Sequence, residues 1–286
     1  MSAAHNDSPV TGIYAQLGAL NPSWRVDVGA PSGPGWITGA DLTCAASGPF
    51  HDLLVRIGDR ARTTDKRTIA ASFAVRYGWA SAMAIAPFLE HDCVPDISLG
   101  NVSFKFREST FFEKTAIHEP RGVMVAGDGC AAHPSMATVA TPDALLRTLR
   151  TALVAQAAPV VDALFDWSGF SPKGSWGMLT SSWAAHFTSL GGDRQDQRTI
   201  APIITRFFAG DDVVTEMQPR LHPVEWMGVT HLYQRRASCC RWYLLPQGEL
   251  CASCPLVSQE ERVARNLAWM KTQLERPAGA SSGGHT

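Results

Sequence analysis

The spacing of apolar and polar residues predicts a chain that is mostly helical. Helical patterns occur in six segments, residues 50–62, 65–90, 141–167, 173–190, 196–208 and 258–274. Three of these segments begin with capping signals. Asp65 is a suitable N-cap residue, Pro142 follows Thr141 in a first helical turn, and residues 258–261 (Ser-Gln-Glu-Glu) have the pattern of a capping box.

Between the second and third helical segments the pattern changes to the alternation that is typical of strands. Residues 95–106 approach strict alternation, and residues 110–117 and 123–126 are expected to pair with them in a small antiparallel sheet. The first 48 residues, rich in glycine, proline, serine and alanine, predict loops with short elements. Residues 230–245 predict an extended segment that runs through two adjacent cysteines.

These elements predict an α+β fold: a mostly helical body, a small antiparallel sheet, and a C-terminal cysteine-rich hairpin followed by a helix. We place the body at residues 1–220 and the C-terminal segment at residues 221–286, packed together as one unit.

Composition narrows the function classes. The 286 residues carry a net charge of −1, with a predicted pI of about 6.7, so no overall basic field attracts a nucleic acid. The chain shows no run of about 18 apolar residues, which a membrane-spanning helix would need, and its first residues lack the features of a secretory signal. We therefore expect a cytoplasmic protein whose cysteines are reduced thiols.

Four of the seven cysteines lie in one short window: Cys239, Cys240, Cys251 and Cys254. The spacing C-C-x10-C-x2-C indicates a soft metal centre with thiolate ligands. Adjacent cysteines in an extended segment point to opposite faces, so they cannot close on one ion unless the backbone bends. A two-iron cluster offers two ligand positions at each end, and we interpret the window first as an all-cysteine [2Fe–2S] site. A zinc site is the second interpretation, and two disulfides the third.

The other three cysteines, Cys44, Cys93 and Cys130, are dispersed along the chain and are expected to be structural thiols.

The cysteine window resembles the C-terminal signature of the FhuF-like ferric siderophore reductases. The resemblance is tight over residues 235–256 and looser over residues 70–108. It implies that the four cysteines hold a [2Fe–2S] cluster and that the protein reduces a ferric siderophore by one electron, releasing Fe²⁺. It also favours a hydroxamate siderophore. No nucleotide-binding pattern occurs, so the electron donor is expected to be a separate protein such as a ferredoxin or a flavoprotein reductase.

Basic residues near the cysteines are candidates for binding the substrate or the donor. Arg235, Arg236 and Arg241 flank the window, and ordinary solvated charges at a strand edge are the alternative interpretation. Lys105 and Arg107 share one face of a predicted strand, where a plain solvent face is the alternative to a chelate-binding surface.

The aromatic stretch 242–244 (Trp-Tyr-Leu) is expected to shield one side of the cysteines. Two other functions stay open from the sequence: a zinc-stabilised siderophore-handling or binding domain, and an iron–sulfur redox sensor.

Overall fold

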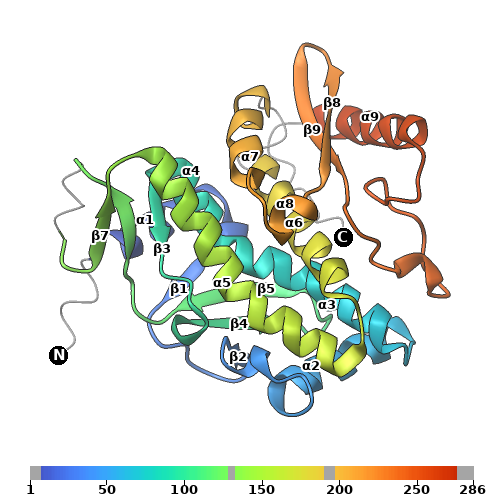
Figure 1. Cartoon of the computed structure of the whole chain (residues 1–286), viewed down its shortest axis with the longest axis horizontal. Helices are drawn as coiled ribbons and strands as arrows, with labels where there is room; N and C mark the ends of the chain where they lie inside the picture. Colours follow the sequence, from blue (N-terminus) through green and yellow to red (C-terminus); the bar gives the residue numbers. More distant parts are fainter. Residues whose placement is uncertain (1–7, 128–132, 190–196, 276–286) are drawn as a thin grey trace.

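The structure, a computed structural model, describes residues 8–127, 133–189 and 197–275 (Figure 1). Helices dominate and the sheets are small, so the predicted α+β class is confirmed. The α-helices are α1 (Pro9–Leu20), α2 (Gly48–Ala61), α3 (Lys66–Ser81), α4 (Ile85–His91), α5 (Pro142–Ser168), α6 (Pro172–Ser189), α7 (Ala201–Phe208), α8 (Val213–Glu216) and α9 (Gln259–Glu275). The strands are β1 (Val26–Val28), β2 (Trp36–Thr38), β3 (Cys93–Pro95), β4 (Val102–Phe106), β5 (Phe112–Ile117), β6 (Gly122–Val125), β7 (Met136–Val139), β8 (Arg220–Trp226) and β9 (Val229–Arg235).

The strands form separate sheets rather than the single sheet expected from the sequence. The larger sheet has the order β1-β5-β4-β2, with β1 parallel to β5 and the other pairs antiparallel. Strand β6 does not join β4 and β5, as predicted, but pairs with β3 and β7. The buried Asn101 lies just before β4, and its side-chain amide donates to the carbonyl oxygens of Asp96 and Glu119, which follow β3 and β5.

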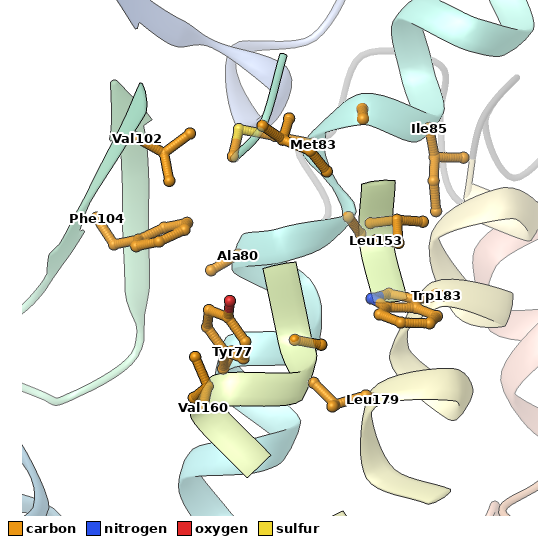
Figure 2. Packing of buried hydrophobic residues seen from close by; sticks show 14 of the residues in the cluster. Tyr77, Ala80, Met83, Ile85, Val102, Phe104, Leu153, Val160, Leu179 and Trp183 are labelled. Carbon is orange, nitrogen blue, oxygen red and sulfur yellow. The ribbon is translucent and has the colours of Figure 1, made fainter. Parts of the chain in front are cut away.

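Helix α3 lies at the centre of the body and is buried along most of its length (Figure 2). It packs against α5, α6 and the four-stranded sheet. The Tyr77 ring meets the Phe104 ring of β4 edge-on at 5.7 Å, and the indole nitrogen of Trp183 on α6 donates to Ser81 Oγ at 2.9 Å. The stretch from Lys66 to His91 is long and apolar enough to cross a membrane, but 83% of its apolar 18-residue window is buried within the protein, as in a core helix.

The long helix predicted over residues 65–90 is interrupted. Asp65 caps α3 as expected, accepting a hydrogen bond from the Arg67 amide. A 3₁₀ turn over Ala82–Ala84 then separates α3 from α4. Pro87 explains the break, because proline lacks an N–H group and its ring clashes with the carbonyl group four residues earlier, that of Met83.

Helix α1 falls within the first 48 residues, where only short elements were expected. Its buried residues Val10, Ile13, Tyr14 and Leu17 follow helical spacing, and Pro9 occupies its first turn. The sequence therefore contained the helical signal, which the surrounding glycine and proline residues obscured.

The C-terminal elements pack on one another and on the body. Helix α9 lies beside the β8–β9 hairpin (Figure 1), where the Asn266 amide contacts His222 Nε2 at 3.1 Å. Strand β9 also contacts the body, because the Leu232 amide donates to Gln197 Oε1 and the Gln234 side chain donates to the Ser181 carbonyl oxygen. The hairpin thus has a fixed position beside α6.

His186 makes the stability of the fold dependent on pH. It is buried on α6 against Trp79, and neither ring nitrogen has a hydrogen-bond partner among the described residues. Burial lowers the pKa of His186 to about 4, whereas the unfolded chain has an ordinary value of about 6.5. Below about pH 6.5 the unfolded chain binds a proton that the buried imidazole does not. The free energy of unfolding is therefore highest above about pH 6.5 and falls as the pH decreases towards 4.

We therefore expect the free energy of unfolding to decrease by roughly 1–3 kcal/mol between about pH 7 and 5. His186→Leu should reduce this decrease, because it removes the titrating group without breaking a hydrogen bond among the described residues. Urea unfolding followed by circular dichroism at the two pH values measures the effect, with His91→Leu as the control. An equal pH dependence in the wild type and His186→Leu would show that His186 is not responsible.

Candidate metal centre

The cysteine segment begins where β9 passes the first turns of α6. The Ser238 hydroxyl donates to the Gly174 carbonyl oxygen at 2.7 Å. Gly177 permits this approach, because a Cβ atom at that position would lie 2.7 Å from Ser238 Oγ. The start of the segment is therefore pressed directly against the backbone of α6.

The backbone bends at the paired cysteines, and the expectation of an extended segment through residue 245 is wrong. Strand β9 ends at Arg235, and Cys239 and Cys240 have no regular structure. Arg241 adopts the left-handed conformation with φ of 61°, and a 3₁₀ turn over Trp242–Leu244 follows. This bend redirects the chain directly after the adjacent cysteines.

Arg241 fastens this bend to the body. Its guanidinium donates to Thr68 Oγ1 at 3.1 Å and to Asp65 Oδ2 at 3.0 Å, both at the first turn of α3. The hydrogen bond from Thr68, and then the neighbouring Arg241, lower the pKa of Asp65 and keep the carboxylate charged. The Arg241 amide lies 3.3 Å from Cys239 Sγ, toward which it donates a hydrogen bond.

The second pair of cysteines forms a tight turn. The Cys254 amide donates to the Cys251 carbonyl oxygen at 3.0 Å, and Cys251 Sγ lies 3.4 Å from Ser253 Oγ. The Arg236 amide donates to the Ser253 carbonyl oxygen at 2.9 Å, which ties this turn to the end of β9. The ten residues between the two cysteine pairs therefore form a closed loop.

Three of the four thiols influence one another. Burial raises the pKa of the Cys254 thiol, and the neighbouring Cys251 and Cys239 sulfurs raise it further. Cys254 is buried, whereas Cys239, Cys240 and Cys251 are half-buried. Cys240 packs instead against the edge of the main hydrophobic core.

The four thiols are the donor set of a soft metal centre. The cysteines within the described residues are free thiols, so the disulfide interpretation receives no support there. No group of three or more His, Cys, Asp or Glu side chains that could hold a metal ion occurs among the residues that the structure describes. Four thiols in two sequence pairs match the two ligand positions at each iron of a [2Fe–2S] cluster.

The predicted basic residues near the cysteines have different environments. Arg235 donates to the Pro255 carbonyl oxygen at 3.0 Å, and Arg241 is paired with Asp65 as described above. The Arg236 side chain makes no hydrogen bond or ion pair with any residue that the structure describes.

Lys105 and Arg107 belong to the four-stranded sheet. Lys105 lies 3.9 Å from Glu113 on the neighbouring strand, and Arg107 is exposed just after β4. Both residues thus lie on a different surface element from the cysteine segment, and their role in chelate binding stays a prediction.

The aromatic stretch after the cysteine pair lies at the surface. Trp242, Tyr243 and Leu244 are 37%, 41% and 51% exposed, and their role in shielding one side of the cysteines stays a prediction. Leu245 is the buried residue of this loop.

Two of the remaining cysteines are described by the structure. Cys93 is fully buried on β3, as expected for a structural thiol, whereas Cys44 is exposed. Cys130 lies outside the described residues.

Sequence reasoning missed two residues that shape the site. Arg262 is buried on α9, and its guanidinium donates to the carbonyl oxygens of Cys254 and Val257. Gly248 passes so close to the loop backbone that a Cβ atom there would lie 1.8 Å from the Trp242 carbonyl oxygen. Residues 246–248 (Pro-Gln-Gly) have the composition of a turn, whereas nothing in the sequence distinguishes Arg262 from the exposed arginines.

Comparison with protein families identifies the segment. Residues 236–256 match the family model described as the FhuF 2Fe-2S C-terminal domain, and the four cysteines fit its motif. The match confirms the resemblance found in the sequence and the assignment of a [2Fe–2S] cluster as the cofactor. No curated protein matches the chain closely enough to serve as a relative.

Replacing Gly248 should disturb the site. Gly248→Ala places a methyl group against the Trp242 carbonyl, so the loop must shift, at a cost of roughly 1–3 kcal/mol in unfolding free energy. We expect less than half of the wild-type iron and sulfide per chain. Gly12→Ala is the control, because a Cβ atom at Gly12 meets no atom within 4 Å. Wild-type cluster content in Gly248→Ala would contradict the importance of this contact.

Proposed function

We propose that this protein is a ferric siderophore reductase that works in the cytoplasm. It accepts one electron at a time from a separate ferredoxin or flavoprotein reductase and delivers it to a ferric chelate, from which Fe²⁺ then leaves. The observation that carries the proposal is the match of the four-cysteine segment to the FhuF 2Fe-2S C-terminal domain.

We propose Cys239, Cys240, Cys251 and Cys254 as the four thiolate ligands. A [2Fe–2S] cluster supplies one-electron chemistry when bound. The chain supports the thiolates with hydrogen-bond donors, namely the Arg241 amide at Cys239 and the Ser253 hydroxyl beside Cys251. Such donors stabilise the thiolate form and influence the reduction potential.

One-electron reduction is sufficient to release iron from a siderophore. Fe³⁺ is a hard cation that oxygen donors such as hydroxamates bind strongly, whereas Fe²⁺ is softer and is bound far more weakly. The donor protein loses one electron and the ferric ion gains one, so the chelator leaves the reaction unchanged. No nucleophile or general base is required, and the resemblance favours a hydroxamate substrate.

The surface beside the cysteines suits contact with a chelate. The positive charge of Arg236 is unpaired among the described residues, and Trp242, Tyr243 and Leu244 offer exposed apolar area. This combination attracts an anionic chelate with an apolar backbone. Lys105 and Arg107 are proposed to contribute only if the substrate extends over the four-stranded sheet.

The ligand assignment predicts which cysteines the cluster needs. Cys251→Ser and Cys254→Ser should each lose most of the roughly two irons and two sulfides expected per chain, because serine is a poor ligand for a soft metal centre. Metal and sulfide analysis of anaerobically purified protein measures the loss, together with the spin-half EPR signal after dithionite reduction.

Cys44→Ser and Cys93→Ser are the matched controls, one exposed and one buried, and both should keep the wild-type spectrum. Full iron and sulfide retention in both Cys251→Ser and Cys254→Ser would overturn the ligand assignment. A colourless protein carrying one zinc ion would instead favour the zinc-stabilised binding domain.

The activity is tested by mixing the reduced protein with a ferric trihydroxamate under anaerobic conditions. We expect one Fe²⁺ per reduced cluster, detected by a ferrous-specific chromophoric chelator, together with recovery of the oxidised visible spectrum. A ferric catecholate tested in parallel compares the two substrate classes. A reduced cluster that transfers no electron to either chelate would favour a redox sensor.

A further inference from the structure

Arg262 is a buried cation without a carboxylate partner among the described residues. Arg262 is 1% exposed, although it lies in the first turns of α9, where most neighbouring residues are at the surface. Its Nη1 atom donates to Gln259 Oε1 at 2.8 Å, and Nη2 donates to the carbonyl oxygens of Cys254 and Val257. The Nε atom is buried and has no hydrogen-bond partner in the described part of the chain.

The groups that act electrostatically on Arg262 are cysteines and another arginine. Burial and the neighbouring Arg235 lower the pKa of Arg262, whereas Cys254 and Cys251 oppose that change. Arg235 donates to the Pro255 carbonyl oxygen, so two guanidinium groups bind the carbonyl oxygens of the turn that contains Cys254. Positive charge is therefore concentrated on the α9 side of this turn.

A buried charge is costly unless an opposite charge lies close to it. Neutral acceptors satisfy the Arg262 Nη atoms in part, but they carry no net charge to balance the guanidinium. Four thiolates, two sulfides and two Fe³⁺ ions sum to two negative charges, and reduction adds a third. A [2Fe–2S] cluster on the neighbouring cysteines would provide the missing anion.

We propose that Arg262 is the buried counter-charge of the cluster and raises its reduction potential by stabilising the reduced form. The inference rests on the proposed four-thiolate site but not on siderophore reduction. In this role Arg262 is a positioning and tuning residue, because it acts on the cluster through its charge and through the Cys254 turn. A positive charge stabilises the more negative state, so its removal should make reduction less favourable.

Arg265 provides a matched control on the same helix. It also binds the cysteine loop through a backbone carbonyl, that of Leu250, at 2.5 Å. Its side chain is 42% exposed and is paired with Glu261, so solvent and a carboxylate weaken its field. If arginines on α9 only hold the loop in place, Arg262 and Arg265 should affect the cluster in the same way.

The experiment is a redox titration of the full chain, followed by visible absorption and EPR. We expect Arg262→Met to lower the equilibrium constant for cluster reduction at least tenfold, which for one electron corresponds to about 59 mV. Arg262→Lys keeps the charge and should change the constant less than threefold, as should Arg265→Met. Equal constants in the wild type and Arg262→Met would overturn the proposal.

A second variant tests the charge without removing the side chain, in case Arg262→Met binds no cluster. Gln259 accepts a hydrogen bond from Arg262 and is exposed, so Gln259→Glu neutralises the cation while keeping the contact. We expect it to lower the reduction constant in the same direction, by about threefold or more, while Glu260→Gln has no such effect. An unchanged constant in Gln259→Glu would also overturn the proposal.

These measurements separate the inference from the proposed function. A shifted potential in a protein that reduces no ferric chelate would support the role of Arg262 and reject the reductase. An unchanged potential in the Arg262→Met variant of an active reductase would reject the role of Arg262 and support the reductase. Thermal unfolding of the cluster-free variants reports any structural cost of each substitution separately.

Discussion

Burial of α3 on nearly all sides is the constraint on which the rest of the structure depends. A helix that is mostly apolar or small around its circumference must be covered by several elements, and α5, α6 and the four-stranded sheet provide that cover (Figure 2). The contact with α6 is especially close at Gly78, where a Cβ atom would lie 2.6 Å from Ser182 Cβ. Once α3 is fixed in this way, its first turn presents the exposed Asp65 and the buried Thr68 to Arg241, which binds both.

Guanidinium groups and the backbone hydrogen bonds of short turns, rather than a regular helix or sheet, hold the cysteine segment. Outside a helix or sheet, its carbonyl oxygens need other donors, and Arg235, Arg262 and Arg265 supply them. Arginine suits this task because its planar group offers several donors in fixed directions. The same side chains bring positive charge to a segment that gathers thiolates, so the structural and electrostatic requirements of the site are met together.

Much of the fold could be predicted from the sequence because its signals are local. The caps at Asp65 and Thr141 and the capping-box serine, Ser258, lie where expected, since each depends on residues only a few positions apart. The cysteine motif was equally readable. Sheet pairing was not readable, because β6 pairs with β3 through residues far apart in the sequence, such as Cys93 and Met124.

The site shows the same division between local and distant determinants. Its four cysteines form a sequence pattern, whereas the burial of Arg262 results from the packing of α9 against the hairpin. Likewise, the ion pair between Arg241 and Asp65 joins residues 176 positions apart. The spacing of residues along the chain predicts neither the burial of Arg262 nor the ion pair of Arg241. Both features nevertheless help to hold the cysteine segment in place.

Most of the cysteine segment contributes little to the main hydrophobic core, which only Cys240 of the four cysteines contacts. Leu245, Cys254 and Val257 are buried, but they lie outside the large hydrophobic cluster of the body. Their burial therefore adds little to the main core. We expect a chain that has lost its cluster to keep the core of the body, so the structural change on cluster loss should be confined to the C-terminal elements.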